Sequence, residues 1–243
     1  MEVNPYGIES LWQQGDLVIK SVAILLLLMS IATWSIFLVR AWGLWRQHRY
    51  IGNLAGFWCL QSFEEGINQL GPRTEQNIFR HLAEEGGAAL NHHRHHNNDL
   101  QAHLPLNEWL SSSLKGAMDE GAEQLQYGLP VLASVGATAP FIGLFGTVWG
   151  IYHALVSIGI SGQASIDKIA GPVGEALIMT ALGLAVAIPA VLAYNALVRA
   201  NKKVLGKLNR FARQLYAYLL TGAAPMQEAG RSVSPLETEI GAR

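Results

Sequence analysis

Three stretches of this 243-residue chain are long and apolar enough to cross a lipid bilayer, which takes about 20 consecutive residues. They cover residues 17–39, 129–160 and 172–198, and Lys20 is the single charged side chain within the first. A soluble protein could bury one such helix, but three in a chain of this length are hard to explain in that way. Charged residues make up 14% of the chain, against about 25% in ordinary soluble domains. The sequence therefore predicts an all-α membrane protein with three transmembrane helices.

Basic residues predict the side of the membrane on which each connecting segment lies, because segments rich in Lys and Arg stay in the cytoplasm. The first 16 residues contain none, and the link 158–171 contains only Lys168. The segment after the first stretch opens with Arg40, Arg46 and Arg49, and further basic residues follow the third stretch. We therefore predict that the N-terminal tail (1–16) and the link (158–171) lie outside. The segment 40–128 and the C-terminal part lie in the cytoplasm.

The predicted organisation has transmembrane helices at 17–39, 129–157 and 172–198. Apolar residues at helical spacing continue before the second span and after the third, which indicates that helices extend into a cytoplasmic bundle. A basic helix is expected at 199–221, and short helices at 51–70 and 74–85. The stretch 86–98 is expected to be a loop. The tail 222–243 has no periodicity and is predicted to be disordered.

Small residues predict how the spans pack. The second and third spans are rich in Gly and Ala, which let helix backbones approach closely, whereas the first is rich in Leu, Ile and Val, which suit lipid. We expect the first span to lie outside and the other two to pack inside, around an axis or a partner. The glycines assigned to this packing are Gly143, Gly146, Gly150 and Gly183.

A cluster of histidines, His92, His93, His95 and His96, lies in the predicted loop 86–98. Imidazoles bind transition metals, but a structural site holds its ligands in fixed geometry, and the glycines and asparagines around this cluster make the loop pliable. We favour an exposed polar loop and predict no metal site and no cofactor. His153, at the outer end of the second span, is open to two interpretations: a proton relay or an interfacial side chain bonded to water.

Glu175 is the ionisable residue of the third span. A carboxylate in lipid is costly and usually faces a protein partner or water, where it serves ions or protons. The alternative is an interfacial carboxylate near a helix N-terminus, where negative charge is favoured. Position alone favours the functional interpretation.

Two threonines, Thr147 and Thr180, accompany Glu175 in the second and third spans. Their hydroxyls both donate and accept, so they can carry a water chain or bond a carboxyl group; alternatively, each can bond back to its own helix. Five residues at about 100° each place Glu175 and Thr180 roughly 140° apart on a straight helix. Either the helix start at residues 172–174 is irregular, or the two residues face different neighbours.

Other functional classes lack support in the sequence. Net charge is −1, so no overall field attracts nucleic acid. The chain has no H-E-x-x-H, G-x-S-x-G or phosphate-binding glycine loop, and we predict that it is not an enzyme.

Two segments carry a family resemblance. Residues 139–150 read APFIGLFGTVWG, and residues 174–177 (GEAL) are followed by TALGLAVAIPAV at 180–191. Together they resemble the signature of the MotA/TolQ/ExbB proton-channel family. Leu11, Trp12 and the DLVIK segment at 16–20 are more similar to the ExbB branch than to TolQ, and the three spans differ from the four of MotA.

The resemblance implies a role and an assembly. ExbB-like proteins form ring-shaped homopentamers in the bacterial inner membrane around the helices of an ExbD dimer. They use the proton-motive force to drive TonB, which energises uptake of siderophores and vitamin B12 across the outer membrane. The family's channel glutamate falls on Glu175, and its two channel threonines fall on Thr147 and Thr180. Protons are the coupling ion, and the N-terminus is periplasmic.

Two alternatives stay open at this point. One is a TolQ-like subunit of the Tol-Pal envelope system, working with TolR and TolA. The other is a membrane scaffold in which Glu175 only fixes helix register, a known structural use of buried polar groups.

Overall fold

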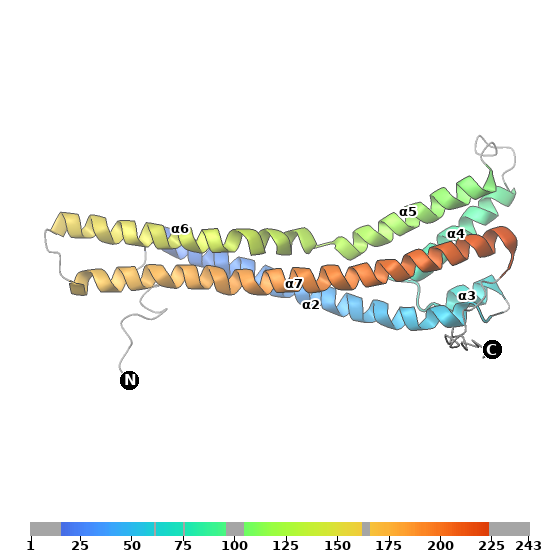
Figure 1. The fold of residues 1–243 in the computed structure, drawn as a ribbon, viewed down its shortest axis with the longest axis horizontal. Helices are drawn as coiled ribbons and strands as arrows, with labels where there is room; N and C mark the ends of the chain where they lie inside the picture. Colours follow the sequence, from blue (N-terminus) through green and yellow to red (C-terminus); the bar gives the residue numbers. More distant parts are fainter. Residues whose placement is uncertain (1–15, 61, 75, 96–104, 162–165, 224–243) are drawn as a thin grey trace, which may run out of the picture. The chain divides into compact units, whose positions relative to one another are not determined.

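The computed structural model describes residues 16–60, 62–74, 76–95, 105–161 and 166–223, and these parts are helical, with no strand. The helices are α2 (Leu17–Phe57), α3 (Phe63–Gln69), α4 (Ile78–His95), α5 (Leu106–Gln126), α6 (Leu129–Ser161) and α7 (Ile166–Thr221) (Figure 1). Three helical stretches, one in α2, one containing α6 and one in α7, are long and apolar enough to cross a membrane. The predicted all-α membrane protein with three spanning helices is confirmed.

The helices run beyond the predicted spans. Helix α2 continues to Phe57, because residues 40–57 contain no proline and keep the helix hydrogen-bonded. Helix α6 extends to Ser161 and α7 begins at Ile166, so the connection between them is shorter than the predicted link 158–171. Helix α7 continues to Thr221, past the predicted end of the span at 198. Most of the predicted tail, residues 224–243, lies outside the described residues.

The chain divides into two compact units. Unit 1 contains the chain up to Gly52 and residues Asp119–Lys207, which carry the three spans. Unit 2 contains Asn53–Met118 and the chain from Leu208 onward.

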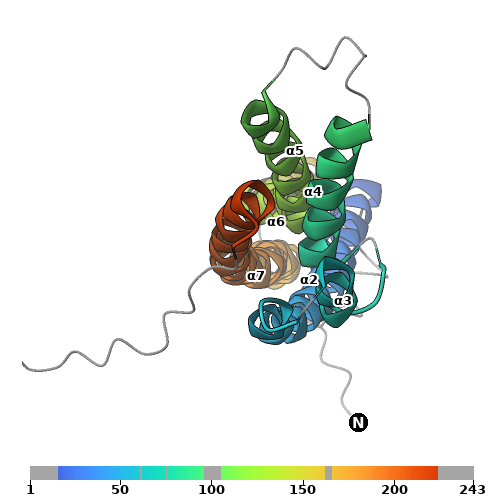
Figure 2. The same cartoon turned by 90° about the vertical axis from the view of Figure 1, so that its right-hand side faces the viewer.

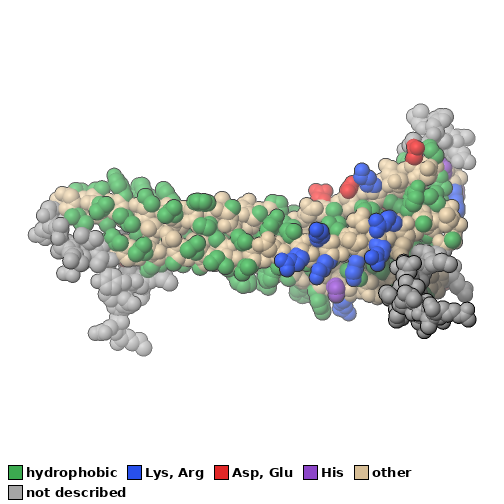
Figure 3. Space-filling model, viewed as in Figure 1, with side chains coloured by type: hydrophobic (Ala, Val, Ile, Leu, Met, Phe, Trp, Pro, Cys, Tyr) green, Lys and Arg blue, Asp and Glu red, His purple; other side chains and the backbone are tan. Residues whose placement is uncertain are grey.

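In unit 1, α2, α6 and α7 lie side by side (Figure 1). Their shared core is made of one face of each helix: Ile19, Val22, Leu26, Val135, Ala139, Met179, Val186, Ala187 and Ala190. The outward faces are apolar as well, and Figure 3 shows hydrophobic side chains over α6 and the first half of α7. Apolar residues on both the inner and the outer faces are typical of a helix bundle in lipid.

The boundary between α5 and α6 is set by Gly128. Its φ of 81° lies in the left-handed region that glycine adopts freely, and this ends α5. The carbonyl groups at the end of α5 accept hydrogen bonds from two other helices of unit 1. Arg40 on α2 donates to Gln124 O and Leu125 O, and Asn201 on α7 donates to Leu125 O. These bonds satisfy terminal carbonyls that a helix leaves unpaired.

Unit 2 is held by an aromatic cluster around Phe211 on α7. The Phe211 ring lies 5.3 Å from the ring of Phe57 and 6.2 Å from that of Phe79 (centroid distances), with edge-to-face geometry in both pairs. Trp58 lies 5.8 Å from the same ring. Figure 2 views these helices end-on, with α4 between α5 and α3.

The prediction of a loop over 86–98 was wrong for residues 86–95, which form the second half of α4. The missed signal is a stripe of buried residues at helical spacing that continues into this stretch through Gly86 and Ala89. A Cβ at Gly86 would lie 3.0 Å from Leu114 Cδ2 and 3.0 Å from Leu219 Cδ1. Small residues therefore let α4 approach α5 and α7, and this packing outweighs the low helix propensity of glycine.

We expect Gly128→Ala to destabilise unit 1 by about 1 kcal/mol, because an alanine in the left-handed region is strained. The new Cβ would also lie 3.0 Å from Ile36 Cγ2. The thermal unfolding midpoint of the detergent-purified protein measures the effect. Gly206→Ala is the control: Gly206 lies within α7 with no atom near its Cβ position, so alanine there should be neutral or stabilising. Equal unfolding midpoints for the two variants would contradict a strained, left-handed backbone at Gly128.

Candidate functional site

Glu175 lies in α7 and is buried, with 8% of its surface exposed. Among the residues that the structure describes, none donates a hydrogen bond to its carboxyl group or forms an ion pair with it. A carboxylate within a membrane span is costly unless it meets a partner, and the described residues supply none. This property separates Glu175 from an ordinary surface carboxylate.

Thr147 on α6 is buried and makes contacts to both α6 and α7. Its Oγ1 lies 3.2 Å from Gly143 O on its own helix and 3.1 Å from Ala176 O on α7. It also forms a short hydrogen bond with the hydroxyl of Thr180. The hydroxyl of Thr147 therefore contacts its own helix, as in the second interpretation considered from the sequence, and it also crosses to α7.

The chemistry of the neighbouring groups limits how the two hydroxyl protons of Thr147 and Thr180 can be arranged. The two carbonyl oxygens can only accept, and the Thr147 hydroxyl has one proton. When Thr147 donates that proton to a carbonyl, Thr180 must donate to Thr147. The lone pairs of Thr180 are then the acceptors available to a further donor. The pair can also reverse its direction, since either oxygen can donate.

The angular relationship between Glu175 and Thr180 follows from a regular helix. Helix α7 is continuous from Ile166 and contains Pro172, so Glu175 lies within the helix and not at its first turn. Ala176 and Thr180, four residues apart, share the face that contacts Thr147. Glu175 lies about 100° around the helix from Ala176. Glu175 therefore does not share the helix face on which Ala176 and Thr180 meet Thr147.

Glycines bring α6 and α7 into backbone contact at this level. A Cβ at Gly143 would lie 2.7 Å from Met179 O, and one at Gly183 would lie 2.7 Å from Ala139 O. A Cβ at Gly146 would lie 3.0 Å from Met179 Cβ, and one at Gly150 would lie 2.8 Å from Ala176 Cβ. All four glycines proposed for packing therefore lie at positions where a side chain would collide with α7 or α6. This close approach allows the short hydroxyl of Thr147 to reach α7.

Two participants were missed from the sequence. The carbonyl of Ala176 accepts from Thr147, and Gly136 packs against Val191, whose Cγ2 would lie 2.5 Å from an added Cβ. A backbone carbonyl has no signature in the sequence. Gly136 continues the small-residue pattern toward the start of α6 and could have been included.

The histidines do not gather into a metal site within the described residues. His92 stacks on Trp109, with centroids 5.9 Å apart, and His95 Nδ1 lies 2.8 Å from Asn91 O. His96 lies outside the described residues. His153 is on α6, where its ring stacks on Trp149 with centroids 6.1 Å apart.

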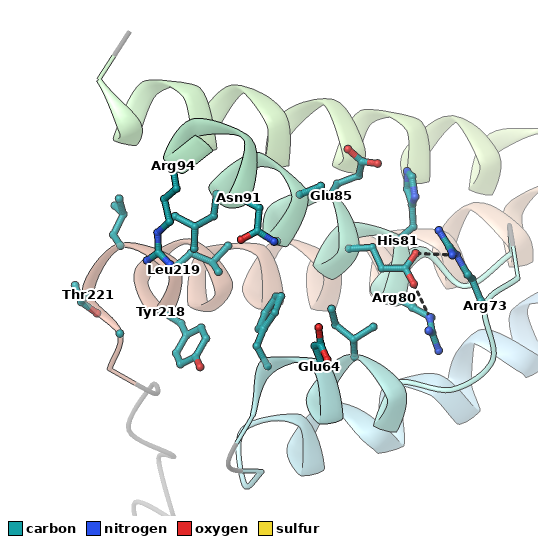
Figure 4. A pocket seen from close by; sticks show the side chains of 18 of the residues that line it. Glu64, Arg73, Arg80, His81, Glu85, Asn91, Arg94, Tyr218, Leu219 and Thr221 are labelled. Carbon is teal, nitrogen blue, oxygen red and sulfur yellow. Dashed lines mark hydrogen bonds and ion pairs between the residues drawn. The ribbon is translucent and has the colours of Figure 1, made fainter. Parts of the chain in front are cut away.

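Unit 2 contains a cavity of about 1270 Å³ between α3, α4 and the end of α7 (Figure 4). Charges at this cavity pair with one another: Arg80 Nε lies 2.8 Å from Glu84 Oε1, and the exposed Arg73 places its Nε 3.5 Å from Glu84 Oε2. Arg80 also donates to Gly71 O at 2.5 Å. These groups form a structural network, and Glu175 remains the stronger candidate for a functional site.

Comparisons with known proteins identify the family of this chain. A model of the MotA/TolQ/ExbB proton channel family matches residues 72–210. The Biopolymer transport protein ExbB of Neisseria meningitidis serogroup A is 43% identical over 218 residues, which cover 88% of this chain and 97% of that protein. The chain belongs to the MotA/TolQ/ExbB proton channel family.

Other relatives within the MotA/TolQ/ExbB family differ in how much of this chain they match. The ExbB of Xanthomonas campestris pv. campestris (strain B100) is 38% identical over 86% of this chain and 85% of its own. The Tol-Pal system protein TolQ of Pseudomonas aeruginosa is 40% identical over 46% of this chain and 48% of its own. Family membership and three apolar helices make the protein a multi-pass membrane protein of a transport family.

We expect Gly143→Ala to separate α6 from α7 and to lower stability by roughly 1–3 kcal/mol, because the obstructing atom is a backbone oxygen that cannot rotate away. Thermal unfolding of the purified protein measures the change. Gly159→Ala, on the same helix but with nothing near its Cβ position, is the matched control and should be neutral. A Gly143→Ala variant as stable as Gly159→Ala would contradict the close contact.

Thr147→Val should lower stability by about 1 kcal/mol, because the contacts to Ala176 and Thr180 need the hydroxyl. Thr147→Ser keeps the hydroxyl and should restore part of the loss. Thr138→Val is the control, since the exposed Thr138 bonds only back to Ser134 O on α6. Equal unfolding free energies for the two valine variants would remove the special role of Thr147.

Proposed function

We propose that this chain is the ExbB-type subunit of a proton-driven motor in the bacterial inner membrane. In this proposal five copies form a ring around the helices of an ExbD dimer. The complex couples the proton-motive force to TonB for uptake of siderophores and vitamin B12 across the outer membrane. The N-terminus is periplasmic and the C-terminus cytoplasmic. The observation that carries the proposal is a buried Glu175 that finds no partner among the described residues, next in the chain to Ala176, whose carbonyl accepts from the hydroxyl of Thr147.

A carboxyl group in this environment suits proton handling. An ionisable side chain within a membrane span usually faces a protein partner or water and marks a path for ions or protons. A proton that crosses the membrane releases about 2.3 kcal/mol per 100 mV. This is comparable with the few kcal/mol that separate alternative helix packings, so protonation can shift a partner helix.

The apolar surface of unit 1 supports an assembly. Large apolar side chains are exposed on the outward faces of α6 and α7, including Phe141, Phe145, Leu177 and Leu192. In the most apolar window of α2, 17% of the residues are buried inside the chain, compared with 39% in α7. The lower burial of α2 agrees with a first span nearer the lipid and with inner spans that contact other chains.

The coverage of the relatives favours ExbB over TolQ. The ExbB relatives align over most of the chain, whereas the TolQ relative of Pseudomonas aeruginosa aligns over 46% of it. The Haemophilus influenzae TolQ is 51% identical, but over 33% of the chain. Shared residues near the channel segments are expected of both branches, so the extent of the match is the more informative quantity.

We expect Glu175→Gln to abolish proton flux and TonB-dependent uptake while the complex still assembles. Glutamine keeps the shape and polarity of the side chain but cannot release a proton near neutral pH. Proton flux is measured with the complex, purified with its partner subunits, in liposomes under an imposed potential. Siderophore uptake is measured in cells that lack their own copy. Glu108→Gln, at an exposed position on α5, is the control.

The outcomes separate the candidate functions. Normal flux and uptake in Glu175→Gln would exclude the proton role. Loss of assembly without a specific flux defect would favour the scaffold interpretation. Restoration of envelope integrity in a strain lacking TolQ, without restoration of siderophore uptake, would favour the Tol-Pal system.

A further inference from the structure

Asp16 uses both of its carboxylate oxygens at the start of α2. Oδ1 accepts from the backbone N–H of Leu17 at 2.6 Å, and Oδ2 accepts from the indole Nε1 of Trp149 at 3.2 Å. Its backbone carbonyl accepts from Lys20 N at 3.1 Å, which makes Asp16 the N-cap of α2. The same side chain therefore caps one transmembrane helix and bonds another.

Trp149 is a large anchor on α6. Its indole N–H can only donate, and a partly buried Trp needs an acceptor for it. The rings of Phe145, Tyr152 and His153 surround the indole at centroid distances of 6.1–6.3 Å. Its side chain also packs against the core cluster shared by α2, α6 and α7. Fixing this ring consequently fixes the outer part of α6.

The anchor lies next to the candidate site. Gly150, the following residue, contacts both neighbouring helices: a Cβ there would lie 2.8 Å from Ala176 Cβ and 3.6 Å from Ile19 Cδ1. Thr147, two residues earlier, bonds the carbonyl of Ala176. A displacement of the first turn of α2 thus acts on the residues that hold Thr147 against α7, beside Glu175.

We propose that Asp16 is a positioning residue for the proton site. Through Trp149 it holds α6 against the start of α2, and thereby holds the contacts of Thr147 with Ala176 and Thr180. Asp16 carries no proton itself in this arrangement. The inference rests on the proposed function of Glu175 and adds a residue whose role is geometric.

Four variants separate the contributions of Asp16. Asp16→Ser keeps an N-cap side chain but is too short to reach Trp149, so it removes the bond between helices alone. Trp149→Phe removes the same bond from the other side and keeps an aromatic ring. Asp16→Asn is neutral but still offers an acceptor oxygen. The double variant Asp16→Ser/Trp149→Phe tests whether the two single changes remove one interaction.

The measurement is proton flux in liposomes per assembled complex, with the partner subunits present. We expect Asp16→Ser and Trp149→Phe each to lower flux roughly fivefold, the factor that corresponds to one lost hydrogen bond. The double variant should be no worse than either single variant. Asp16→Asn should retain most of the flux, because an acceptor is needed and a charge is not.

The outcomes distinguish this inference from the proposed function. Loss of flux in Asp16→Asn equal to that in Asp16→Ser would overturn positioning and make Asp16 a proton carrier. Wild-type flux in Asp16→Ser and Trp149→Phe, with flux lost in Glu175→Gln, would overturn the role of Asp16 alone. Additive losses in the double variant would show that the two residues act separately. Normal flux in Glu175→Gln would overturn the proposed function itself.

Discussion

The backbone contact between α6 and α7 is the constraint on which the rest of unit 1 depends. Gly143 on α6 and Gly183 on α7 face each other. A Cβ added to either glycine would lie 3.0 Å from the Cα of the other. In lipid, where apolar side chains gain nothing by leaving the solvent, close van der Waals contact and interhelical hydrogen bonds hold helices together. A hydroxyl as short as that of Thr147 can bond the opposite backbone only because the helices are this close.

The same packing supplies Glu175 with no partner among the described residues. Helix α7 turns Ala176 and Thr180 toward α6, and Glu175 lies about 100° of helical rotation before Ala176. A chain that buries a carboxylate without a partner bears a cost that only an external group or a bound proton can offset. This cost connects the packing of one chain to a function carried out with others.

Much of the fold could be predicted because it depends on local patterns. The three apolar stretches define the positions of the long helices, and the small residues of the second and third spans mark the faces that meet. The second half of α4 could not be assigned, because Gly86 and Gly87 suggest a loop until the helices that they approach are known. A Cβ at Gly87 would lie 2.7 Å from Phe63 Cε1, so a side chain there would force the Phe63 ring to shift.

The sequence by itself determined that this chain crosses a membrane three times, that Glu175 is an exceptional carboxylate, and that glycine-rich faces pack. Composition and periodicity act within one helix, so they are visible in the order of residues. Only the tertiary structure decided which groups meet. Thr147 bonds Thr180 across 33 positions, and Asp16 bonds Trp149 across 133. Such pairs follow from helix rotation and register, which are set by the packing of whole helices and leave no local pattern.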